Sequence, residues 1–269
     1  TLSEGDWPVL DHLEKWLGGQ PWRQRPVGRE RKILKHACVR FQQLTSPAAA
    51  KAVEDTAFYR SAVLLSRNDV GFSTEQFSAP LAEFHRINQQ RLQAFPDNLL
   101  ATATHDHKRG EDTRARLAVL SECATWYVEQ VEQWRSLAAP LRTDAATPSA
   151  GDELILYQVL LGSWPLDQGD DFDGYQQRLW QWQQKALREA KLNSSWSAPN
   201  DAYEQGVEAF LSRLLLSDEG RPLRTAIATA AQAIAPAGAL NGLAQSLLRI
   251  TVPGVPDLYQ GAEFWDFSL

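Results

Sequence analysis

LLATATHDHKRGED, residues 99–112, begins as an apolar, alternating run and changes into a dense cluster of polar and charged side chains. Such a run predicts a buried strand over 99–104 that delivers its last side chains into a site at its carboxyl end. In α/β barrels, that end of the strands carries the active site. Gly110 follows and predicts a sharp turn of the backbone just after the strand.

Around this stretch, apolar residues recur at the spacing of helices. One stripe advances in steps of three and four residues, which places its members on one helix face: Leu117, Leu120, Ala124, Tyr127, Val131 and Trp134. The same spacing predicts further helices over 30–38, 77–92, 152–161, 171–191, 203–214 and 238–250. Short apolar runs predict two more strands, over 39–44 and 255–259.

These elements predict a mostly α-helical chain with a few parallel strands. We expect four parts: a helical connector over 1–38, a barrel segment with two strands over 39–112, a helical insertion over 113–230, and a last barrel helix and strand over 231–269. Three strands cannot close a barrel, so the other strands would precede Thr1. The chain contains no methionine and its sequence stops within a structured pattern, so we expect a segment of a longer polypeptide.

Composition narrows the classes of function. The chain has 269 residues, of which 43% are hydrophobic and 22% charged, as in ordinary globular proteins. A net charge of −6 argues against nucleic acid or an anionic membrane as the main partner. No signal peptide or membrane-spanning run is present in the sequence. The two cysteines, Cys38 and Cys123, form no disulfide or metal-binding pattern, which favours a reducing cytoplasm.

The pair His105–Asp106 is open to three interpretations. It could supply two ligands of a metal-dependent phosphohydrolase, but the other histidines show no helical spacing with a further ligand. It could belong to a glycosidase, in which Asp106 stabilises a cationic transition state and His105 holds sugar hydroxyls. It could also be a buried pair that braces a loop, and the two residues alone favour this last interpretation.

The charged residues beside this pair have both a structural and a functional explanation. Lys108 and Arg109 could form a solvated charge run or line a site at the end of the strand. Glu54 and Asp55 could favour the start of a helix or contact a ligand past the first strand. The run from Arg67 to Asp69 predicts a turn.

Five segments, in this order along the chain, carry a resemblance to a known family. They are RFQQLTSPAAAKAVEDTAFYR (40–60), LLATATHDHKRGEDTRARLAVLSE (99–122), LYQVLLGSWP (156–165), KALREAKLNSSW (185–196) and LNGLAQSLLRITVPGVPDLYQGAEFWDFSL (240–269). Together they closely resemble the maltooligosyl trehalose synthases of the α-amylase superfamily of glycoside hydrolases. The resemblance runs from about Lys32 to Leu269.

The resemblance implies a (β/α)8 barrel with helical insertions, of which this chain would hold about strands six to eight. It implies an intramolecular transglucosylation that turns the reducing-end α-1,4 link of a maltooligosaccharide into an α,α-1,1 link. The family's mechanism implies an Asp nucleophile, a Glu acid/base and a third carboxylate that stabilises the transition state. It requires neither a metal nor an organic cofactor.

Site residues follow from the resemblance position by position. Asp106 matches the third carboxylate, and His105 matches the neighbouring sugar-binding histidine. Lys108 and Arg109 would lie near the subsites in which the reducing-end glucose turns round. The other substrate-lining segment supplies matches to a lysine and a glutamate, Lys51 and Glu54.

The sequence also departs from the family. His107 stands where most relatives are expected to have threonine, and Ala48–Ala50 stand where bulkier residues are expected. The nucleophile and the acid/base belong to strands four and five, and no motif in this chain resembles either. We therefore expect the isolated chain to be inactive on glucan.

Two other functions remain open at this point. The full-length protein could be an α-amylase-like glucan hydrolase, because water and the turned glucose compete for one intermediate. The segment could instead be a non-catalytic helical module that binds glucan or protein. Strands cut from a barrel leave exposed edges, so we also expect self-association or local disorder near residues 39–60.

Overall fold

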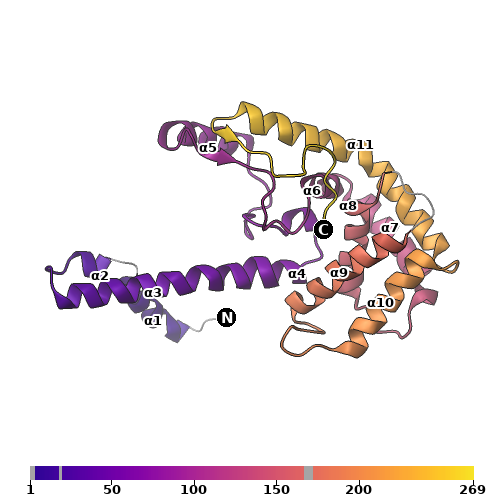
Figure 1. Cartoon of the computed structure of the whole chain (residues 1–269), viewed down its shortest axis with the longest axis horizontal. Coiled ribbons are helices and arrows are strands. Elements are labelled where there is room, and N and C mark those ends of the chain that lie inside the picture. The colour runs from indigo at the N-terminus through magenta and orange to yellow at the C-terminus, as the bar shows by residue number, and fades with distance from the viewer. Residues whose placement is uncertain (1–3, 18–19, 167–171) are drawn as a thin grey trace. The chain divides into compact units, whose positions relative to one another are not determined.

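The structure is a computed structural model that describes residues 4–17, 20–166 and 172–269. The chain divides into two compact units, Thr1–Asp55 and Thr56–Leu269, which are described separately below (Figure 1). Among the described residues, no helix combines the length and the apolar character that crossing a membrane requires.

The first unit is helical and contains η1 (Glu4–Asp6), α1 (Trp7–Leu17), α2 (Gln20–Arg23) and α3 (Arg29–Ala52). The expected strand over 39–44 is wrong, because these residues lie within α3. The alternation of Val39 and Phe41 does not mark a buried strand face, since both side chains are more than a third exposed. The surrounding Lys, Arg, Gln and Ala residues favour a helix, and Pro47 does not interrupt it.

The second unit holds most of the chain, and the π-helical turn η2 (Val53–Ala57) leads into it. Its helices are α4 (Phe58–Arg60), η3 (Leu65–Arg67), α5 (Leu81–Ala94), α6 (Glu111–Ala118), η4 (Val119–Ser121), α7 (Ala124–Ala138), η5 (Ala139–Leu141), α8 (Ala150–Ser163), α9 (Asp173–Ala190), α10 (Asp201–Leu216) and α11 (Arg221–Thr251). The helices expected over 77–92, 152–161 and 203–214 are confirmed with shifted ends.

Two of the three expected strands are present, and they pair in parallel. β1 (Leu99–Leu100) lies beside β2 (Val255–Pro256), with Leu99 opposite Val255. The amide of Val255 donates to the carbonyl oxygen of Asn98 at 2.9 Å, and that of Asp257 donates to Leu100 at 2.8 Å. Both strands are shorter than the apolar runs that predicted them, but the parallel arrangement typical of a barrel segment is confirmed.

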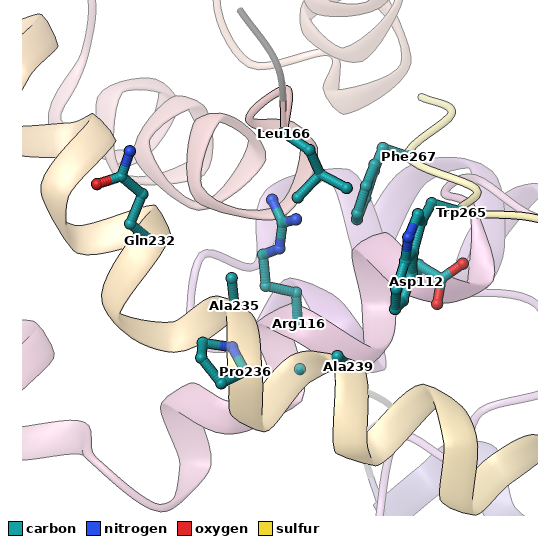
Figure 2. A pocket seen from close by; sticks show the side chains of 10 residues that line it. Asp112, Arg116, Leu166, Gln232, Ala235, Pro236, Ala239, Trp265 and Phe267 are labelled. Atoms are coloured by element: carbon teal, nitrogen blue, oxygen red, sulfur yellow. The ribbon is translucent and has the colours of Figure 1, made fainter.

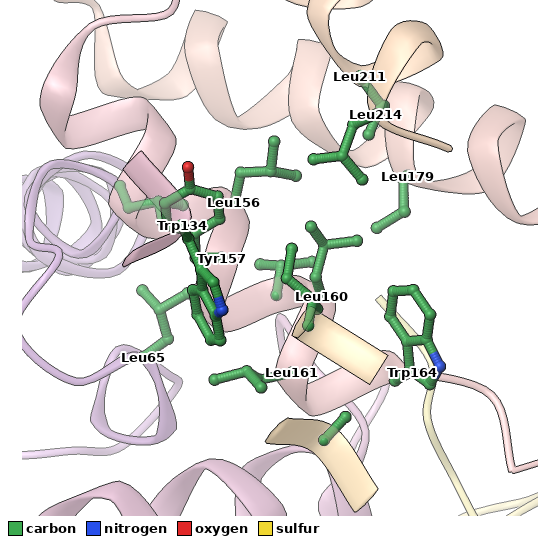
Figure 3. Close-up of a cluster of buried hydrophobic side chains, with 14 of the residues drawn as sticks. Leu65, Trp134, Leu156, Tyr157, Leu160, Leu161, Trp164, Leu179, Leu211 and Leu214 are labelled. Atoms are coloured by element: carbon green, nitrogen blue, oxygen red, sulfur yellow. The ribbon is translucent and has the colours of Figure 1, made fainter. Parts of the chain in front are cut away.

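The core of the second unit surrounds α8. Every residue of this helix from Ile155 to Ser163 is buried, so α8 has no solvent-facing side over that length. Figure 3 shows its leucines between side chains of α7, α9 and α10, with Leu65 closing one side. Helix α9 buries the apolar stripe that its spacing predicts, including Tyr175, Leu179 and Trp182.

Several expected boundaries do not coincide with the ends of helices. The single stripe from Leu117 to Trp134 is divided between α6 and α7, because the backbone leaves the helical conformation at Cys123 (φ −129°). Helix α11 is one helix of 31 residues that runs through the expected division between 230 and 231. The divisions expected after residues 38 and 112 likewise fall inside α3 and α6.

Candidate functional site

The candidate site is the loop of residues 101–110, which connects β1 to α6 at the carboxyl end of the parallel pair. Asp106 lies at the tip of this loop, with its side chain 59% exposed. The Lys108 side chain is only 7% exposed, and its Nζ lies 3.7 Å from Asp106 Oδ1. His105 is exposed beside them. The loop therefore places an exposed carboxylate and an exposed imidazole at the end of a strand, with a largely buried lysine side chain beside them.

The tip of the loop is closed by a turn that uses His107. The amide of His107 donates to the carbonyl oxygen of Thr104 at 3.2 Å. In return, the amide of Thr104 donates to His107 Nδ1 at 3.0 Å, and the Thr104 hydroxyl lies 2.9 Å from the same nitrogen. Nδ1 can accept the amide hydrogen only when it carries no proton, so this turn requires a neutral imidazole.

Acidification is expected to loosen this turn. Burial, followed by the positive charge of Arg114, lowers the pKa of His107 below its ordinary value near 6.5, although Asp69 and Asp106 oppose the change. Because the folded state favours the neutral form, the stabilisation is complete above about pH 6.5 and is lost as the pH falls through the lowered pKa. NMR titration of the His107 ring measures this, and a midpoint at or above 6.5 would contradict it. The His107→Thr variant should lose this component of the pH dependence of unfolding.

Arg109 points into the protein rather than toward Asp106. The residue is 3% exposed, and its Nη1 donates to the carbonyl oxygen of Asn68 at 3.1 Å. Its guanidinium lies 5.8 Å from the ring centre of Trp182. Burial lowers the pKa of this guanidinium, and the nearby Asp69 carboxylate opposes that effect. The residue anchors the loop to the interior of the second unit.

Two further arginines fix the start and the end of the loop. Arg114, on α6, donates through Nη2 to the carbonyl oxygen of Thr102 and through Nε to that of Arg109. Arg249, on α11, donates to the Thr102 hydroxyl at 2.7 Å and pairs with Glu111 at 3.4 Å. The loop is therefore held by side chains from two helices.

Gly110 is required for a different reason from the one that the sequence suggested. Its φ of −56° is open to any residue, so the chain does not need glycine for a turn there. A Cβ at this position would lie 2.4 Å from the carbonyl oxygen of Asp266. The amide of Gly110 donates to the carbonyl oxygen of Ser268 at 2.9 Å, and that of Asp266 donates to Asp112 at 2.8 Å. Glycine thus allows the segment that follows β2 to pack directly on the end of the loop.

The described residues form two cavities near the loop, and Asp106 lines neither of them. One, of about 310 Å³, lies between α6, α11 and the segment after β2 (Figure 2). Figure 2 shows Arg116 against Phe267, whose ring centre lies 4.1 Å from the guanidinium carbon. The other, of about 670 Å³, runs beside β1 and is lined in part by His107 and Arg114. Asp106 instead faces open solvent at the tip of the loop.

The remaining predicted site residues belong to the first unit. Lys51 lies in the last turn of α3 and forms an ion pair with Asp55 one helical turn later. Glu54 lies in η2. Their part in the site stays a prediction. Within the described ranges, no three His, Cys, Asp or Glu side chains form a cluster that could hold a metal ion.

The sequence did not predict the buried residues that hold the loop from the interior of the second unit. Asn68 and Asp69 were expected only to form a turn, yet both are buried and contact Lys108 or Arg109 across about 40 positions of sequence. Arg114, which is also buried, was not singled out from the sequence. Buried charged groups are rare unless they are paired, but this signal appears only once burial is known.

Comparisons with known proteins agree with the resemblance. No family model matches the chain. Proteins of Mycobacterium tuberculosis strains H37Rv and CDC 1551 that carry the name maltooligosyl trehalose synthase are each 39% identical over 231 residues, which cover 86% of this chain. The chain spans 29% of the length of these curated relatives.

Solved structures give the same result. A crystal structure of a maltooligosyl trehalose synthase aligns with a TM-score of 0.76 and 31% identity, over 90% of this chain and 32% of its own. The enzyme from Arthrobacter ramosus aligns with a TM-score of 0.71 and 33% identity, over 87% of this chain and 28% of its own. In sequence and in fold, this chain therefore matches a segment of the maltooligosyl trehalose synthases, about a third of the length of these relatives.

Proposed function

We propose that the chain is a segment of an enzyme that converts the reducing-end α-1,4 link of a maltooligosaccharide into an α,α-1,1 link. The observation that carries the proposal is the place of Asp106. An exposed carboxylate stands at the carboxyl end of a parallel strand pair, and the chain matches relatives named for this activity. In barrel enzymes, catalytic residues come from those strand ends.

Three side chains at the tip of the loop have a chemical part in this proposal. Asp106 stabilises the positive charge that develops on the anomeric carbon in an oxocarbenium-like transition state. Its exposed side chain is free to approach a bound sugar ring. His105 and Lys108 donate hydrogen bonds to hydroxyl groups of the glucose units on either side of the reacting bond.

The remaining predicted residues, Arg109, Lys51 and Glu54, have different proposed parts. Arg109 is buried, so we assign it to holding the loop rather than to direct contact with glucan. Lys51 and Glu54 keep the proposed part of a second substrate-lining segment. The nucleophile and the acid/base would come from parts of the enzyme outside this sequence, so the chain by itself is expected to be inactive.

Product analysis tests the proposal. The full-length parent protein, incubated with maltopentaose, should convert it into a non-reducing isomer of the same mass, which chromatography and a reducing-sugar assay detect together. The purified chain alone should leave maltopentaose unchanged. Release of shorter reducing sugars as the main product would favour a glucan hydrolase and contradict the proposal, as would the absence of any reaction by the parent protein.

We also propose a cytoplasmic location and self-association of the isolated chain. The described part of the chain adds no third strand to β1 and β2, so each keeps one unpaired edge. Residues 39–52 cannot supply the edge expected there, because they are helical. Light scattering that gives a concentration-independent monomer mass would contradict self-association.

A further inference from the structure

We propose that Asp69 is a positioning residue for the candidate site, because its carboxylate fixes the main chain at Lys108 and thereby holds Asp106 and Lys108 at the tip of the loop. This inference rests on the function proposed above. Asp69 belongs to the segment after η3, far from the loop in sequence, and it touches none of the exposed groups that would meet the substrate.

The contact between Asp69 and the loop is direct. Oδ1 of Asp69 accepts a hydrogen bond from the amide of Lys108 at 2.9 Å and a second from the amide of Val70 at 2.8 Å. The residue is completely buried, at 0% exposure. Hydrogen bonds from amides to a carboxylate are stronger than those between neutral groups, and water does not compete for them here.

The segment that carries Asp69 is itself fixed to the core. The side chain of Gln158, on the central helix α8, accepts from the amide of Leu65 at 2.8 Å and donates to the carbonyl oxygen of Ala62 at 2.7 Å. The Asn68 side chain donates to the carbonyl oxygens of Phe58 and Ser61 at 2.9 and 2.6 Å. The backbone that carries the carboxylate is therefore held in place by these hydrogen bonds, as a positioning residue requires.

The charge of Asp69 is balanced within the same cluster. Its Oδ2 lies 3.8 Å from Nε of Arg114, whose side chain is 8% exposed. Arg114 also donates to the carbonyl oxygens of Thr102 and Arg109, so this ion pair connects both ends of the loop. Among the described residues, Oδ2 has no hydrogen-bond partner, which leaves the ion pair and Oδ1 as its connections.

These contacts hold the loop on both sides of its tip, and the tip itself is exposed. The main chain is held at Thr102, Lys108 and Arg109, while Asp106 and His105 lie between these points and face solvent. Loss of the Asp69 carboxylate would release Lys108, which is two residues from Asp106. A displacement of about 1 Å at a catalytic group costs on the order of 10²-fold in rate.

The first test uses this chain and needs no activity. Selective 15N labelling of lysine lets NMR follow the exchange of the Lys108 amide with solvent. We expect Asp69→Ala to speed this exchange at least about tenfold and Asp69→Asn to speed it less, because asparagine keeps an oxygen acceptor. Asp152→Asn is the matched control: Asp152 is also buried but contacts Ser149, Tyr203 and Asn193 instead.

The ring of His107 gives a second signature of the same contact. The groups that face it are Arg114, Asp69, Asp106 and Lys108, and the negative charge of Asp69 raises its pKa. Asp69→Asn should therefore lower the pKa of His107 further, and Asp152→Asn should leave it unchanged. Unchanged Lys108 exchange and an unchanged His107 titration in folded Asp69→Asn and Asp69→Ala would overturn the proposal.

The second test uses the full-length parent enzyme. We expect Asp69→Ala to lower kcat about 10²-fold while KM stays within about threefold, and Asp69→Asn to lower kcat less. Unchanged kcat in both variants would overturn the positioning role even if the loop moves. If the unaltered parent forms no non-reducing isomer, the proposed function fails, whereas the NMR result still decides whether Asp69 holds the loop.

Discussion

Replacing Asp106 by asparagine in the full-length parent enzyme is expected to lower the rate of glucan isomerisation by at least about 10³-fold without changing its thermal unfolding. The loss is expected because asparagine has nearly the same shape but cannot stabilise a developing positive charge as a carboxylate does. Stability should not change, because the Asp106 side chain is 59% exposed and its ion-pair distance to Lys108 is 3.7 Å. Initial rates on maltopentaose measure the effect.

The chain offers a matched control at the other end of the same strand. Asp97 is also exposed, and it precedes β1 whereas Asp106 follows it. Asp97→Asn should retain activity within about twofold, since the amino end of a barrel strand contributes to stability rather than to chemistry. Activity of Asp106→Asn within tenfold of the unaltered enzyme would remove Asp106 from the catalytic machinery.

The sequence predicted the strand pair because both strands carry local signals. An apolar run that ends in polar residues precedes Asp106, and a proline-bounded run ends at Tyr259. The strand expected over 39–44 failed because it rested on only two alternating positions. Helix propensity over the whole of 29–52 outweighs such a short pattern, and only the longer window shows this.

At the site, too, the sequence predicted features that depend on neighbouring residues and missed those that depend on contacts between distant segments. Asp106 and Lys108 are close in sequence, so their common place at one strand end could be expected. Asp69 could not be predicted, because its contact with Lys108 joins residues 39 positions apart. The sequence predicted a sharp turn at Gly110, but glycine is needed there because Asp266 approaches it closely. That approach depends on packing between distant segments, which no local pattern shows.

The largest expected loss of stability follows from Trp134→Ala, in the core of the second unit. Trp134 is completely buried on α7, and its ring packs edge-on against Tyr157, with ring centres 5.3 Å apart. Truncation leaves a cavity that the neighbouring helices cannot fill, at a cost of about 3–5 kcal/mol. For a unit of this size, we expect the unfolding temperature to fall by about 10 °C.

Val128→Ala on the same helix is the control for Trp134→Ala. Val128 is 55% exposed, so its truncation should change the unfolding temperature by no more than about 2 °C. Equal falls in the unfolding temperature of the two variants would show that Trp134 does not pack as described.

The core and the loop are connected through α8, because Gln158 on this helix holds the segment that leads to Asp69. Trp134→Ala should therefore speed exchange of the Lys108 amide as well, although the two residues are not in contact.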